Sequence, residues 1–170
     1  MKRVYFDRAA ASPVNADVLE AMLPYFREAY GNPQSLHAEG RRALDAVDNA
    51  RGSVALLVGA DPEEIYFTSS GSESNNLAVK GLAGALKSKG DHLVISAVEH
   101  ASVLNSARAL ERAGFKVTTV PVDAEGRVVP AAVEAALTPE TVLVSVMAAN
   151  NEVGTLEPVD EIAALCKARG

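Results

Sequence analysis

The chain has 170 residues, of which 48% are hydrophobic and 22% charged, which suffices for one globular domain and excludes an intrinsically disordered chain. The formal net charge of −6, without clustered Lys or Arg, argues against a nucleic-acid-binding protein, and no apolar stretch is long enough to span a membrane. The N-terminus has no signal-peptide pattern and the single Cys166 cannot form an internal disulfide, so we expect a cytoplasmic protein.

The first region, residues 1–60, is predicted to be an extended start followed by helices. Apolar residues recur at helical spacing over residues 19–26, and Pro24 inside this pattern predicts a kink or break. A second apolar face recurs over residues 44–57 and predicts a long helix. Gly59 is a suitable end for that helix, because glycine readily adopts the left-handed conformation that closes helices.

The second region, residues 61–170, is predicted to be α/β, with a mainly parallel sheet and flanking helices. Short β-rich runs alternate there with helical patterns, and the runs are Ile65–Thr68, Leu93–Ser96, Val117–Val120 and Val142–Val146. Strands separated by helices are typical of parallel sheets. The second and fourth runs are apolar almost throughout, which indicates strands covered on both faces.

Three polar clusters follow predicted strands, at the ends where open α/β sheets bind ligands. They are residues 69–72 (Ser-Ser-Gly-Ser), Glu99–His100 and residues 150–152 (Asn-Asn-Glu). The carboxyl ends of parallel strands meet at one edge of a sheet, so we expect the clusters to converge. Convergence favours a binding site over three unrelated structural roles.

Each cluster also has a structural interpretation. The first suits an anion, because a glycine turn at a helix start offers free N–H groups, yet Ser70 and Glu73 also have the spacing of a capping box. His100 fits either a general acid/base or ring-stacking role, or a histidine that caps or packs at a helix start. The paired asparagines fit either ligand orientation or a turn.

No metal site is predicted. The three histidines, His37, His92 and His100, have no metal-ligand spacing with Cys166. Cys166 lies in the last helical pattern among small apolar residues, so we interpret it as a structural thiol.

Five motifs, in order along the chain, resemble those of the cysteine desulfurases, within the class V aminotransferase group of fold-type I pyridoxal-phosphate enzymes. The motifs are Tyr5–Pro13, Gly31–His37, Phe67–Asn76, Glu99–His100 and Ala149–Thr155. The resemblance extends over essentially the whole chain, and five ordered motifs at matching intervals are far more specific than any one of them.

The resemblance implies site residues and a cofactor, pyridoxal 5'-phosphate. It implies that Gly71 and Ser72 hold the cofactor phosphate. It also implies that His100 stacks on the pyridine ring and moves protons as a catalytic residue, and that Asn151 bonds the phenolic oxygen. Asn150 would lie next to these residues without contacting the cofactor itself.

The resemblance further implies an activity and partners. A desulfurase converts L-cysteine to L-alanine and leaves the sulfur as an enzyme-bound persulfide. A sulfur-acceptor protein would then receive that sulfur for iron–sulfur cluster assembly. The family also implies a homodimer.

The chain departs from the family pattern in two ways. Arg8 stands where a small amide is usual, and Ser72 replaces a threonine but keeps its hydroxyl. The family's Schiff-base lysine, and its sulfur-accepting cysteine, lie in motifs that this chain does not contain. The resemblance therefore implies the incomplete large domain of a fold-type I enzyme, truncated before the Schiff-base lysine.

We expect such a chain to be inactive alone, and to associate with a C-terminal fragment, oligomerise or aggregate. Three other interpretations stay open. The first is a selenocysteine lyase or another class V aminotransferase-like enzyme, the second is a non-enzymatic truncated scaffold, and the third is a simple α/β module that binds a phosphate ligand. Neither nucleic acid nor a membrane is expected as a partner.

Overall fold

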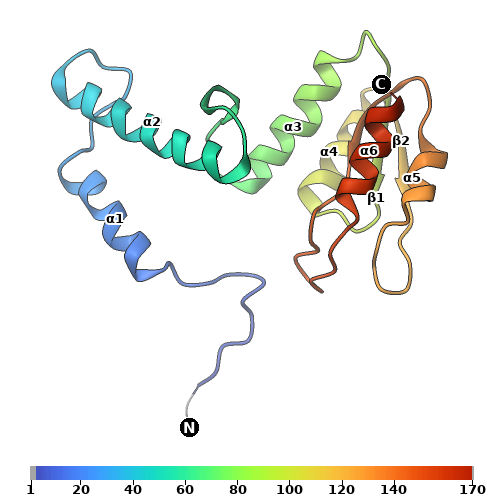
Figure 1. Cartoon of the computed structure of the whole chain (residues 1–170), viewed down its shortest axis with the longest axis horizontal. Coiled ribbons are helices and arrows are strands. Elements are labelled where there is room, and N and C mark those ends of the chain that lie inside the picture. Colours follow the sequence, from blue (N-terminus) through green and yellow to red (C-terminus); the bar gives the residue numbers. More distant parts are fainter. Residues whose placement is uncertain (1–2, 170) are drawn as a thin grey trace. The chain divides into compact units, whose positions relative to one another are not determined.

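The computed structural model describes residues 3–169, which form two compact units, one up to Phe67 and one from Thr68 onward. The first unit contains helices α1 (Ala16–Arg27) and α2 (Ala38–Val58) and the 3-10 turn η1 (Pro62–Glu64). The second unit alternates helices and strands, as Figure 1 shows: α3 (Gly71–Ala85), β1 (His92–Ser96), α4 (Ala101–Arg112), β2 (Lys116–Val120), α5 (Pro130–Ala136), β3 (Thr141–Ser145) and α6 (Val159–Arg169). Within residues 3–169, no helix is both long and apolar enough to cross a bilayer.

The first unit confirms the predicted long helix and corrects the prediction of a break at Pro24. Helix α2 ends at Gly59, whose φ of 69° lies in the left-handed region. Helix α1 continues through Pro24 to Arg27. The Pro24 carbonyl accepts hydrogen bonds from the N–H groups of both Glu28 and Ala29, at 2.8 and 2.9 Å, so the helix closes one turn after the proline.

The predicted strand Ile65–Thr68 is wrong. This segment is extended but pairs with no strand among the described residues. The Arg51 side chain, from α2, holds it instead by donating to the Ile65 carbonyl and placing its guanidinium 5.3 Å from the centre of the Phe67 ring. The β-rich composition of this segment therefore predicted its extended backbone, but not the absence of a partner strand among the described residues.

The other three predicted strands form a parallel sheet in the order β2-β1-β3, which confirms the predicted fold class. In register, Leu93 of the central strand lies opposite Val117 on one side and Leu143 on the other. All five residues of β1 are buried, whereas all five residues of β3 are half-buried. Among the described residues β3 has only one neighbouring strand, and this leaves its outer side more open.

Helices cover both faces of this sheet (Figure 1), as the apolar strand patterns predicted. Leu93 packs on one face with residues of α3 and α4, including Val79 and Val103. The next residue, Val94, points to the opposite face and packs with Val133 of α5 and Ile162 of α6. Successive strand residues alternate between faces, so β1 alone contributes to both clusters.

Gly90, between α3 and β1, permits a close approach that no side chain would allow. A Cβ atom there would overlap the carbonyl group of Glu140, which accepts the His92 N–H at 3.0 Å. We expect Gly90→Ala to destabilise the protein by about 2–3 kcal/mol in urea unfolding, since backbone rather than a flexible side chain must move.

The matched control is Gly84→Ala, in the exposed part of α3. A Cβ at Gly84 would meet no atom within 4 Å. Alanine has the higher helix propensity, so this change is expected to stabilise the protein by about 0.5–1 kcal/mol. Equal effects of the two substitutions would contradict the close approach at Gly90.

Candidate functional site

The first polar cluster forms the start of helix α3. Ser70 is the N-cap, and its side chain accepts the Glu73 N–H at 3.2 Å. The Glu73 carboxylate accepts the Ser69 N–H at 2.7 Å and the Ser69 hydroxyl at 2.5 Å. These hydrogen bonds from Ser69 hold the pKa of Glu73 below its usual value. The capping interpretation of Ser70 is therefore confirmed.

Capping leaves the two residues predicted to bind an anion free to do so. Among the described residues, the N–H groups of Gly71 and Ser72 donate to no partner, because they lie in the first turn of the helix. Both residues are exposed, and a Cβ at Gly71 would meet no atom within 4 Å. The cap and the N–H groups predicted to bind an anion are different atoms, so the two interpretations of this cluster are compatible.

The second cluster forms the start of helix α4. His100 is the N-cap of α4, and its Nδ1 accepts the Ser102 N–H at 3.1 Å. The Ser102 hydroxyl lies 2.8 Å from the same Nδ1. The His100 side chain is exposed, and its Nε2 has no hydrogen-bond partner among residues 3–169. The histidine thus has a structural role on one nitrogen, while the other has no partner among the described residues.

Hydrogen bonds join the three clusters at the carboxyl edge of the sheet. The Asn75 side chain, on α3, donates to the Ser102 hydroxyl on α4 at 2.8 Å. The Asn150 side chain, after β3, donates to the Val98 carbonyl at 3.4 Å, two residues before His100. The expected convergence of the three segments is therefore present, whereas the roles of individual residues stay predictions.

The two asparagines of the third cluster have different surroundings. The Asn150 side-chain oxygen accepts the N–H groups of Glu152 and Val153, at 2.9 and 3.1 Å, so Asn150 forms the turn. Asn151 is exposed, and its side-chain amide donates to the Glu152 carboxylate at 3.1 Å, with no other hydrogen-bond partner within residues 3–169. Asn151 is the asparagine whose amide can turn to a ligand at little structural cost.

Two buried carboxyl groups lie beneath this edge, and sequence reasoning missed one of them. Glu99 is 8% exposed and accepts the Ser96 hydroxyl at 3.2 Å. Burial, with a smaller contribution from the charge of Glu157, raises the pKa of Glu99, although a hydrogen bond from the Met147 backbone opposes this. Glu157 accepts the Val128 N–H at 2.7 Å with one oxygen, while its other oxygen is buried and has no hydrogen-bond partner in the described part of the chain. No spacing in the sequence indicated Glu157, which meets this edge only in the folded chain.

The raised pKa of Glu99 predicts a pH-dependent effect on stability. A carboxyl group whose folded pKa exceeds its ordinary value of 4.5 contributes its stability at low pH, and loses it as the pH rises through the folded pKa. We therefore expect Glu99→Gln to raise the urea midpoint at neutral pH, with the gain shrinking to nothing as the pH falls below that ordinary value. The control Glu111→Gln, on the exposed side of α4, removes a carboxylate that is not buried and should leave the urea midpoint at neutral pH nearly unchanged. A gain that grows on acidification would contradict the burial argument.

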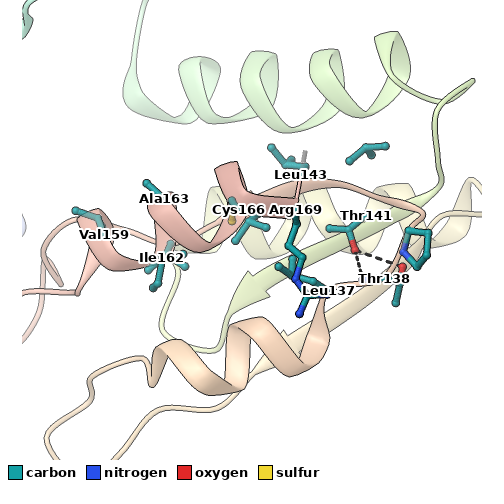
Figure 2. Close-up of a pocket in the computed structure, with 13 residues that line it drawn as sticks. Leu137, Thr138, Thr141, Leu143, Val159, Ile162, Ala163, Cys166 and Arg169 are labelled. Carbon is teal, nitrogen blue, oxygen red and sulfur yellow. Dashed lines mark hydrogen bonds between the residues drawn. The ribbon is translucent and has the colours of Figure 1, made fainter.

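A hollow of about 460 Å³ lies along β3, away from the polar edge. Figure 2 shows it between Leu143 of β3 and the α6 residues Ala163 and Cys166. None of the predicted site residues lines it. Burial raises the pKa of the Cys166 thiol, which disfavours the nucleophilic thiolate and supports its interpretation as a structural residue.

The sequence model of the family "Aminotransferase class-V" matches residues 4–170. The chain belongs to the class-V aminotransferase family. Enzymes of this family use pyridoxal 5'-phosphate, whose phosphate group needs hydrogen-bond donors. The free N–H groups of Gly71 and Ser72 beside open space fit that need.

Individual relatives within the class-V aminotransferase family are desulfurases. The chain is 48% identical over 168 residues to cysteine desulfurase IscS of Dictyoglomus turgidum (strain DSM 6724 / Z-1310), and this match covers 98% of the chain but 43% of the relative. A solved NifS-like protein matches 99% of the chain and 46% of its own length, with a TM-score of 0.95 and 41% identity. A structure described as SspA in complex with cysteine matches 96% of the chain and 47% of its own length, with a TM-score of 0.92 and 42% identity. The chain thus spans less than half the length of these class-V aminotransferase relatives.

Proposed function

We propose that the chain is part of a pyridoxal-phosphate-dependent cysteine desulfurase. The reaction converts L-cysteine and an enzyme thiol to L-alanine and an enzyme persulfide, so the sulfur leaves the substrate and joins the thiol. The observation that carries the proposal is made at the carboxyl edge of the sheet, where a hydrogen bond joins the starts of α3 and α4. The N–H groups of Gly71 and Ser72 and the Nε2 atom of His100 have no hydrogen-bond partner there among the described residues. Similarity to desulfurases over 98% of the chain supports it.

Four residues would hold or face the cofactor. The N–H groups of Gly71 and Ser72, with the Ser72 hydroxyl, would bind its phosphate at the positive end of α3. The exposed Asn151 amide would donate to its phenolic oxygen, and His100 would lie against its ring. When bound, the cofactor supplies an electron sink for the α-carbon of the substrate.

The remaining polar residues of this edge would keep the site in shape. Asn150 bonds the Val98 carbonyl, so it ties the loop of Asn151 to the loop of His100. Glu99 is buried directly before His100, and this burial raises the pKa of its carboxyl group. His100 is the residue here that presents a ring nitrogen outward, and a proton can be held or given at Nε2.

We also propose that residues 1–170 are inactive by themselves. Covalent attachment of the cofactor needs a lysine at the site. Lys116 pairs instead with Asp91 at the amino end of the sheet, at 3.3 Å, and Lys87 lies 5.0 Å from the Phe115 ring centre. Lys80 bonds Asn76 along α3 at 2.6 Å. A homodimer, a cytoplasmic location and a sulfur-acceptor protein are further proposals from the family resemblance.

The experiment that tests the function gives L-cysteine to the complete natural protein loaded with pyridoxal phosphate. Alanine and sulfide are then measured in the presence of a thiol reductant. We expect equimolar alanine and sulfide, and neither product from the fragment 1–170. A loaded protein that makes no alanine would reject the proposal. Faster alanine formation from selenocysteine, without sulfide from cysteine, would favour a selenocysteine lyase instead.

A further inference from the structure

The Nδ1 atom of His100 lies within hydrogen-bond distance of two groups of Ser102. The first is the backbone N–H, at 3.1 Å. A backbone N–H can only donate, so Nδ1 must accept at this contact. The second is the hydroxyl, at 2.8 Å, whose direction depends on its other partner.

That other partner is Asn75. Its side-chain amide donates to the Ser102 oxygen at 2.8 Å, although the two residues are 27 positions apart in the chain. The Ser102 oxygen therefore accepts from Asn75 and keeps its own proton for Nδ1. The three side chains form one directed series, from the Asn75 amide through the Ser102 hydroxyl to the His100 ring. Ser102 is 8% exposed, so water has little access to compete for its hydroxyl.

We propose that Ser102, held by Asn75, is a positioning residue that fixes the His100 ring and its tautomer. With Nδ1 accepting, the neutral imidazole carries its proton on Nε2. The outward-facing nitrogen thus begins as a hydrogen-bond donor, and the ring plane is held at the start of α4. The consequence for catalysis rests on the proposed function, whereas the tautomer does not.

The tautomer is tested by long-range proton–nitrogen correlation NMR of the complete protein labelled with ¹⁵N-histidine, at a pH where the ring is neutral. We expect a pyrrole-type signal for Nε2 and a pyridine-type signal for Nδ1 of His100. In Asn75→Asp the carboxylate accepts the Ser102 proton, so Nδ1 loses the hydroxyl donor and keeps only the Ser102 N–H; its signal should shift but stay of the pyridine type. The control Asn105→Asp, on the exposed face of α4, should leave both signals in place. A pyrrole-type Nδ1 in the unaltered protein would overturn the proposal.

The positioning role is tested by kinetics of the same protein with L-cysteine. Ser102→Ala should lower kcat about ten- to a hundredfold with little change in KM, since a misplaced ring weakens the reaction more than substrate binding. Ser102→Thr keeps the hydroxyl and should restore most of kcat. Ser106→Ala is the matched control, because the Ser106 hydroxyl is also buried on α4 but donates to the Ser102 carbonyl, at 2.7 Å, rather than to the ring.

The outcomes separate this proposal from the proposed function. If Ser102→Ala leaves both the His100 signals and kcat unchanged, the positioning role is rejected. If the complete protein makes no alanine but shows the expected tautomer and its response to Asn75→Asp, the function fails while the directed series of hydrogen bonds stands.

Discussion

His100→Ala is expected to reduce alanine formation by the complete protein about 10²- to 10⁴-fold, the usual range for a residue that handles a proton in the reaction. His100 presents Nε2 at the polar edge, while Nδ1 is bonded to Ser102. Alanine removes both nitrogens at once. The measurement is the initial rate of alanine release at saturating L-cysteine.

The difficulty with alanine is that it also removes the N-cap of α4, which costs about 1 kcal/mol of stability. His100→Asn separates the two effects, because the asparagine side-chain oxygen can accept the Ser102 N–H as Nδ1 does, without providing a group at Nε2. We expect this variant to unfold at the urea concentration of the unaltered protein and yet to lose activity like His100→Ala. Retention of activity in His100→Asn would assign His100 a purely structural role.

Ser72→Asp is expected to weaken pyridoxal-phosphate binding about 100-fold or more. A carboxylate there would lie among the free N–H groups at the start of α3, where the phosphate is proposed to bind. Two unit charges 4 Å apart repel by about 4 kcal/mol at an effective dielectric constant of about 20, which alone corresponds to roughly a thousandfold. Titration of the cofactor-free protein, followed by cofactor absorption, measures the dissociation constant.

The same substitution should leave the fold intact, which makes the result specific. A negative charge in the first turn of a helix is favourable by about 0.3–1 kcal/mol, so α3 is not weakened. The control Ser72→Ala removes only one hydroxyl and is expected to weaken cofactor binding about tenfold. Unchanged cofactor affinity in Ser72→Asp would place the phosphate elsewhere.

The elements predicted well from the sequence are those whose side chains repeat with a regular period. Strand β1 was expected within one residue of its observed bounds, and its apolar side chains are buried. Helix α2 was expected from its helical period and ends at Gly59 as predicted, although it begins at Ala38, and Leu44 and Leu57 of its apolar face are exposed. The strand predicted at Ile65–Thr68 is wrong because composition alone does not provide a partner strand. Its composition is that of a strand, but a strand exists only with a partner, and this segment is held by Arg51 instead.

For the candidate site, too, the sequence identified the residues but not their individual roles. Gly71, Ser72, His100 and Asn151 were named from motif positions, and parallel strands require their segments to meet at one edge. The choice between a structural and a ligand-binding role was not contained in those motifs. It depends on single atoms: Ser70 caps α3 while the neighbouring N–H groups stay free, and one nitrogen of His100 caps α4 while the other stays free.

The sequence by itself thus determined the α/β fold class and the segments that carry the site, because hydrophobic period and the alternation of β-rich runs with helical patterns are local properties of the chain. Only the tertiary structure decided which side chains act on one another. The Asn75–Ser102 bond joins residues 27 positions apart, and the pKa of Glu99 is raised by burial and by Glu157, which lies far along the chain. Such contacts depend on how helices pack against the sheet, and burial gives them their energetic effect.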